Sequence, residues 1–218
     1  MTRVAAAALL LCAIAAPAGA QSPSADQRLA KALDAETYAA VTRVIRSAKA
    51  RALPVDPIVD KALEGAVKGA RPVRIRAAVV ALADRMVVAR EALSPPSPTV
   101  AEIGAGAEAL GKGVPRATLR TIRIAGGDRS VAVPLGVLTE LVARGVSVQR
   151  ASDQVVALVK SGATSQQLAA LSDKVRQDIE TGIDPAAALD IRTRGLLPLL
   201  PGSSRLAPTL KPASPRVP

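Results

Sequence analysis

The chain has 218 residues, 49% of them hydrophobic, and contains one Cys, one Tyr and no His, Phe or Trp. The absence of His excludes Ser-His-Asp and Cys-His catalysis and every metal site built on imidazole. The formal net charge of +11 favours partners with negative charge, such as lipid headgroups or wall polymers.

Residues 1–20 have the three parts of a secretory signal peptide. Arg3 lies in a short N-terminal region, residues 4–16 are almost wholly apolar, and Ala18-Gly19-Ala20 fits cleavage before Gln21. A retained membrane anchor is the alternative, but the apolar run is shorter than the roughly 20 residues that a bilayer requires. We expect a protein exported to the periplasm or the cell exterior. Cleavage would remove Cys12, so the mature chain would contain no disulfide.

Helical patterns follow one another from residue 24 to residue 93. Three helices are predicted to begin in this region, at Ser24 with Gln27, at Asp34, and at Asp56 before Pro57. The longest helix is expected from Pro72 to about Leu93. Its predicted inward stripe repeats at helical spacing and consists of Ile75, Val79, Leu82, Met86, Ala89 and Leu93.

Prolines in residues 94–98 forbid a helix there and predict a linker. Further helices are expected from about residue 98 to 110 and from 116 to 124. Lys68-Gly69-Ala70 and Lys112-Gly113-Val114 are separated by 44 residues, with Ile75 matching Leu119, which suggests a faint internal repeat.

The clearest local pattern lies in residues 138–185. Three joints occur there, at Gly145-Val146-Ser147, Gly162-Ala163-Thr164 and Gly182-Ile183-Asp184. In each joint a Gly can end one helix in a left-handed conformation, and a Ser, Thr or Asp can cap the start of the next. Pro185 then fits the first position of a last helix, which is expected to end near Gly195.

These patterns predict an all-α fold of about eight or nine short helices, packed as consecutive antiparallel hairpins. A solenoid-like curvature of this packing is left as an option. The expected organisation is a signal peptide at 1–20, a helical domain at 21–195 and a basic tail at 196–218. Prolines between Leu196 and Pro201 indicate that this tail is not helical, and its composition predicts disorder.

Three motif resemblances have simpler explanations. The segment from Gly106 to Gly113 resembles a phosphate-binding loop, but Gly113 stands where Ser or Thr is needed and no strand precedes the segment.

Asp60 and Glu64 share a helix face and could form a carboxylate pair, although Lys61 and Lys68 favour a solvated face with ion pairs. A helix-turn-helix near Gly145 or Gly162 fits helix packing better than DNA binding, because the protein is expected to be exported.

The basic residues supply the candidate binding site. No catalytic, cofactor-binding or metal-binding residues are predicted, no cofactor is expected, and no nucleic-acid partner is expected because stacking aromatics are lacking. The possible anion-binding residues are Arg43, Arg46, Lys49, Arg74, Arg76, Arg205, Lys211 and Arg216.

Three functions remain open from these observations. The leading hypothesis is a non-catalytic interaction or scaffold protein of the cell envelope, with an envelope protein as its partner. The alternative is an electrostatic binder of anionic envelope polymers or of a membrane surface. The third is a hydrolase that uses Asp60 and Glu64.

Overall fold

The structure is a computed structural model, and it describes residues 24–202. Over that range it contains ten α-helices, one short 3-10 helix and no strand, which confirms the all-α class with a helix count close to the prediction. The helices are α1 (Ala25–Ala32), α2 (Ala35–Ala50), α3 (Asp56–Val67), α4 (Pro72–Leu93), α5 (Val100–Gly111), α6 (Arg116–Gly126), α7 (Ala132–Ala143), α8 (Val148–Lys160), α9 (Ser165–Glu180), α10 (Pro185–Leu196) and η1 (Leu197–Leu199).

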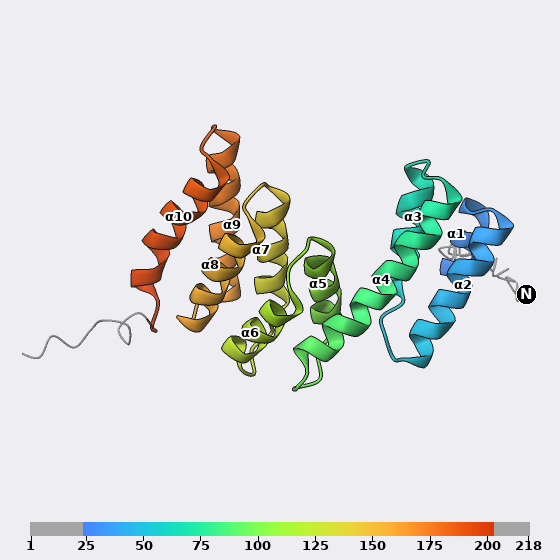
Figure 1. The fold of residues 1–218 in the computed structure, drawn as a ribbon, viewed down its shortest axis with the longest axis horizontal. Coiled ribbons are helices and arrows are strands. Elements are labelled where there is room, and N and C mark those ends of the chain that lie inside the picture. The colour runs from blue at the N-terminus through green and yellow to red at the C-terminus, as the bar shows by residue number, and fades with distance from the viewer. Residues whose placement is uncertain (1–23, 203–218) are drawn as a thin grey trace, which may run out of the picture.

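The helices form an elongated two-row stack, with α1 and α10 at opposite ends (Figure 1). Each helix of the even row packs against the next one, α2 on α4, α4 on α6, α6 on α8 and α8 on α10. The odd row packs in the same way as α1 on α3 and as α5 on α7 on α9. The long α4 contacts α2, α3, α5 and α6, and so joins the α1–α3 group to the α5–α10 group. This is the solenoid-like arrangement that the sequence left open.

The three joints have the predicted geometry. Gly145, Gly162 and Gly182 have φ of 98°, 88° and 94°, a left-handed conformation that Gly adopts without a side-chain clash. The residue after each Gly donates its N–H to a carbonyl five positions back, as when Ala163 N donates to Leu158 O at 2.9 Å. The caps of the next helices are Ser147, Thr164 and Asp184, and each side chain accepts a backbone N–H bond.

The 44-residue repeat corresponds to two helix pairs, α3 with α4 and α5 with α6. Gly69 and Gly113 both follow a helix end with positive φ, of 64° and 85°. Ile75 and Leu119 both lie in the core. The pairs therefore have the same local construction, although α4 is much longer than α6.

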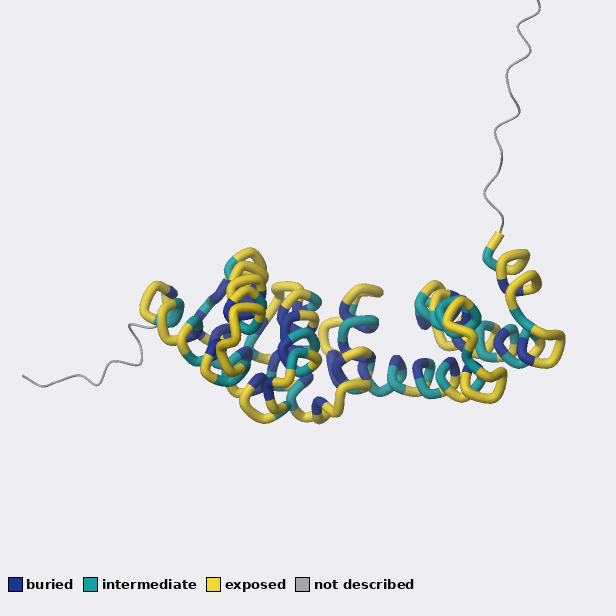
Figure 2. Tube along the Cα trace, turned by 90° about the horizontal axis from the view of Figure 1, so that it is seen from above, coloured by how far each residue is buried: buried dark blue, intermediate teal, exposed yellow. Residues whose placement is uncertain are grey.

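Buried residues occur in the helices along the whole stack (Figure 2), and most of them are apolar. All members of the predicted α4 stripe are buried. Gly106 lets α5 lie close to α4, because a Cβ built there would be 3.0 Å from the Ala89 Cβ and 3.2 Å from the Leu93 Cδ1. Small residues at such positions allow helix backbones to approach one another.

Two local predictions were wrong. Asp56 does not cap α3, because the helix begins at Asp56 itself and its N-cap, Val55, makes no side-chain cap bond. The tail does not begin at 196, because α10 runs through Leu196 and the 3-10 turn Leu197–Leu199 follows. Leu200 is buried, and Gly202 N donates to Ser161 O at 3.0 Å. A tight 3-10 turn accommodates Pro198 where an α-helix would not.

The signal peptide, Cys12 and the tail from residue 203 lie outside the described residues. None of the helices in 24–202 is long and apolar enough to cross a bilayer.

Candidate anion-binding surface

Charge is divided between the two rows of helices. Every helix of the even row carries more Lys and Arg than Asp and Glu, and α6 carries three Arg and no acid. In the odd row, α3, α5, α7 and α9 each carry more acids than bases, and only α1 is basic. The even row is therefore the basic side of the molecule, a separation that the net charge of the chain cannot reveal.

Three of the predicted cations lie together on α2. Arg43, Arg46 and Lys49 are exposed, and no ion pair in the described part of the chain uses them. Arg46 and Lys49 line a cavity of about 400 Å³ between α1, α2 and α3. Asp26 and Asp56 line the same cavity and reduce its positive charge, so the outward side of α2 is the more basic one.

The two predicted cations of α4 have different roles. Arg74 is exposed and forms no ion pair within residues 24–202. Arg76 instead donates to Thr37 Oγ1 at 3.1 Å and pairs with Glu36 at 3.4 Å, which connects α4 to α2. Arg76 is therefore partly engaged in joining the two helices, whereas Arg74 is not. Arg205, Lys211 and Arg216 lie outside the described residues.

Other arginines also bind neighbouring helices. The bonds run from Arg85 to Ala107 O at 3.2 Å, from Arg90 to Arg51 O, from Arg116 to Glu91 at 3.0 Å, from Arg129 to Val159 O and Ala163 O at 3.1 Å each, and from Arg150 to Asp190 at 3.5 Å. A large part of the positive charge is thus used inside the fold.

Glu102 and Arg123 form a buried ion pair between the rows, at 2.9 Å, with exposed fractions of 3% and 5%. Glu102 also accepts bonds from the backbone N–H groups of Val131 and Thr99, at 2.9 and 2.8 Å. Burial alone would raise the pKa of the Glu102 carboxyl, but these N–H bonds, the Thr99 hydroxyl and the Arg123 charge together lower it. Arg123 reaches the carbonyls of Gly127 and Arg129 as well, so one cluster fixes α5, α6 and the start of α7.

A second pair connects the rows at the end of the stack. Arg192 of α10 donates to both oxygens of Asp178 in α9, at 2.7 and 2.6 Å. These side-chain hydrogen bonds lower the pKa of Asp178. Neither pair was predicted from the sequence. Thr99 and Glu102 form a capping box that was readable from their spacing, but nothing in the sequence identified Arg123 as the partner.

In the predicted carboxylate pair on α3, Glu64 is held in its ionised form by two lysines. Glu64 pairs with Lys61 at 3.0 Å and with Lys68, and hydrogen bonds from Lys68 and then Lys61 lower its pKa to about 2. A carboxyl with that pKa holds no proton to donate near neutral pH. The Gly106–Gly113 segment forms the end of α5 with Lys112 as its C-cap, as the simpler interpretation predicted. No cluster of three potential metal-ligating side chains occurs in residues 24–202.

No family model, curated protein or solved structure matches this chain.

Proposed function

We propose that the chain is an exported, non-catalytic interaction or scaffold protein of the cell envelope. The observation that carries this proposal is the open two-row stack, in which ion pairs such as Glu102–Arg123 and Asp178–Arg192 join neighbouring helices. Stacked helical repeats expose extended surfaces, which are suited to binding other macromolecules.

The carboxylates support the same proposal. The pKa values of the Glu64, Glu102 and Asp178 carboxyls are all lowered, which keeps these groups ionised. Hydrogen bonds from Lys68 and Arg192 are the main cause at Glu64 and Asp178, and backbone N–H bonds from Val131 and Thr99 outweigh the effect of burial at Glu102. Groups held in that state stabilise structure through charge-assisted bonds and are unsuited to general acid catalysis.

The proposal is tested by isolating the tagged full-length protein from the envelope fraction after mild cross-linking. We expect one envelope protein to be enriched above a tag-only control and to recover this chain when it is itself tagged. Enrichment of nothing above the control would contradict an interaction role. The mass of the isolated protein also tests export, because cleavage before Gln21 removes residues 1–20.

A second candidate function is electrostatic binding to an anionic envelope polymer or membrane surface. The excess of bases on every even-row helix and the exposed cations of α2 favour it. Such binding weakens with salt, and we expect association with anionic vesicles to be lost by roughly 0.5 M NaCl. Association that salt leaves unchanged would eliminate this candidate.

A further inference from the structure

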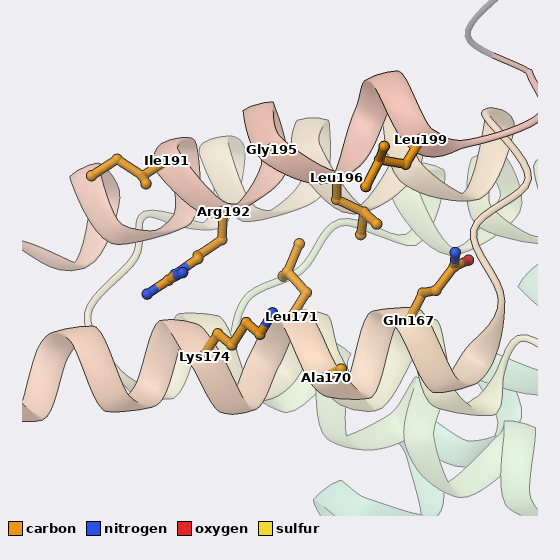
Figure 3. A pocket seen from close by; sticks show the side chains of 9 residues that line it. All are labelled: Gln167, Ala170, Leu171, Lys174, Ile191, Arg192, Gly195, Leu196 and Leu199. Carbon is orange, nitrogen blue, oxygen red and sulfur yellow. The ribbon is translucent and has the colours of Figure 1, made fainter.

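A groove lies at the C-terminal end of the stack, between α9 and α10 (Figure 3). It has a volume of about 520 Å³ and is mostly apolar. Leu171 forms part of it from α9, and Ile191 and Leu196 from α10. Ile191 and Leu199 are 53% and 76% exposed, so the groove leaves large apolar side chains in contact with water.

The position of the groove follows from the two-row stack. In the odd row α7 lies between α5 and α9, whereas α9 has α7 on one side and no further described helix on the other. Counted from their N-caps, Val131 and Thr164, the two helices can be compared residue by residue. Pro134, Val137, Leu138 and Leu141 of α7 correspond to Gln167, Ala170, Leu171 and Lys174 of α9.

All four α7 residues are buried, whereas Ala170 and Lys174 of α9 are exposed and line the groove. The groove is therefore the place that an eleventh helix would occupy. A helix-in-groove complex needs such a surface, with apolar residues at the centre and polar residues at the rim.

Charge indicates which helix could lie there. Lys174 forms no ion pair within residues 24–202, and Arg192 beside it is already paired with Asp178. The groove therefore offers unpaired positive charge next to apolar surface. Acidic residues flanking an apolar stripe would complement both features.

Two other occupants have the wrong charge. Residues 203–218 contain Arg205, Lys211 and Arg216 and no acid, so the tail of this chain would bring like charge to Lys174. A second copy docking end to end would present α1, whose Arg28 and Lys31 are exposed and basic. Both arrangements are disfavoured by repulsion.

We infer that the groove between α9 and α10 is a docking site for an acidic amphipathic helix of a partner protein, which would extend the odd row. This inference rests on the proposed interaction function. The α9 residues that line the groove span two helical turns, about 10 Å at the usual rise, so a partner helix of a few turns is long enough. Its apolar side chains would cover Ile191 and Leu199, and its carboxylates would face Lys174.

Gly195 provides a direct test. It lies in α10 on the groove, and a Cβ built there has no heavy atom within 4 Å. Gly195→Phe therefore fills the groove without a backbone clash. Gly136 of α7 is equally open and lies outside the α9–α10 groove, so Gly136→Phe is the matched control.

The probes are two designed amphipathic helical peptides with the same leucine stripe, one flanked by Glu and the other by Lys. Binding to the full-length protein is measured by fluorescence anisotropy. We expect the Glu peptide to bind at least about ten-fold more tightly than the Lys peptide. Gly195→Phe should weaken it by about ten-fold or more, Gly136→Phe should leave it unchanged, and Lys174→Glu should reverse the preference.

Several results would overturn the inference. Equal affinity for the two peptides, no binding of either, or equal loss in both Phe variants would each do so. Two further measurements are dimerisation by analytical ultracentrifugation and binding to anionic vesicles. If only Gly195→Phe abolishes either of these while peptide binding persists, the groove serves that other occupant and the inference is wrong. If the Gly195→Phe variant still recovers the envelope partner of the full-length protein, the groove is not the docking site, while the proposed interaction function stands.

Discussion

At the scale of single residues, several arginines in residues 24–202 cross-link neighbouring helices. Arg123 and Arg192 each join the even row to an acid of the odd row. The Glu102–Arg123 pair is the most buried of them, and an ion pair in that position is costly to break on one side only.

The first prediction concerns Glu102. Glu102→Ala leaves the Arg123 guanidinium buried without its counter-charge and removes the acceptor of the Val131 and Thr99 N–H groups. We expect the free energy of unfolding to fall by about 3–5 kcal/mol, measured by urea denaturation with helical circular dichroism.

The double variant Glu102→Leu with Arg123→Met is the control for this cause. It removes both charges and should recover part of the loss, because no unpaired ion remains buried. A loss below about 1 kcal/mol in Glu102→Ala would mean that the pair is effectively solvated.

The second prediction concerns acid stability. The pKa values of Asp178 and Glu102 are lowered in the folded protein, Asp178 mainly by hydrogen bonds from Arg192. A group with a lowered folded-state pKa stabilises the fold fully above its unfolded pKa and loses that contribution as the pH falls toward the folded value. The chain has no His, so the urea midpoint should change little from pH 7 to about 5.5 and fall below about pH 4.5.

Asp178→Asn separates this effect from general acid unfolding. At pH 7 the variant should be less stable than the wild type, and the two urea midpoints should converge as the pH falls. A constant difference between them down to pH 3 would show that the ionised carboxylate of Asp178 contributes nothing specific.

At the scale of helices, α5 contains two glycines with opposite roles. Gly104 has open space where its Cβ would lie, whereas a Cβ at Gly106 would press on Ala89, Leu93 and Leu119 of α4 and α6. Glycine within a helix destabilises it relative to Ala by about 0.5–1 kcal/mol. The cost is tolerated at Gly106 because α4 passes so close.

The third prediction compares the two alanine variants. Gly104→Ala should raise the free energy of unfolding by about 0.5–1 kcal/mol, since it gains helix propensity without a clash. Gly106→Ala should lower it, because overpacking costs about 1–3 kcal/mol. Urea denaturation of both variants gives the order directly, and equal stabilisation by the two would contradict the close approach of α4 and α5.

Helix boundaries were largely predictable because their signals are local. The joints at Gly145, Gly162 and Gly182 combine a helix end and a cap within a few residues, and the stripe of α4 repeats at helical spacing. The pairing of Glu102 with Arg123 was not predictable, because it depends on which faces of α5 and α6 meet. Residues 196–202 were misjudged because their prolines forbid an α-helix but permit a 3-10 turn.

At the scale of the whole molecule, the two-row stack separates charge that is mixed along the sequence. Even-row and odd-row helices alternate in the chain, so from α2 to α10 basic and acidic helices alternate as well, and the net charge of +11 hides the pattern. Stacking places the basic helices side by side, which concentrates positive charge on one row. The candidate anion-binding residues Arg43, Arg46 and Lys49 belong to this row.

The last prediction tests whether binding to anionic vesicles depends on the cations of the even row or only on the total charge of the protein. Arg120→Glu with Lys160→Glu reverses two exposed cations of the even row, and Arg28→Glu with Lys31→Glu reverses two of α1 in the odd row. None of the four residues forms an ion pair in residues 24–202, and both variants have the same net charge.

If anionic surfaces bind to the even row, the even-row variant should associate with phosphatidylglycerol-containing vesicles at least about ten-fold more weakly at low salt. The α1 variant should retain most of its binding in the same co-sedimentation assay. Equal weakening of both variants would show that only the total charge attracts the vesicles. Unchanged binding in both would remove these even-row cations from the binding surface, because reversing two exposed charges within a Debye length of a bound anion must lower its affinity.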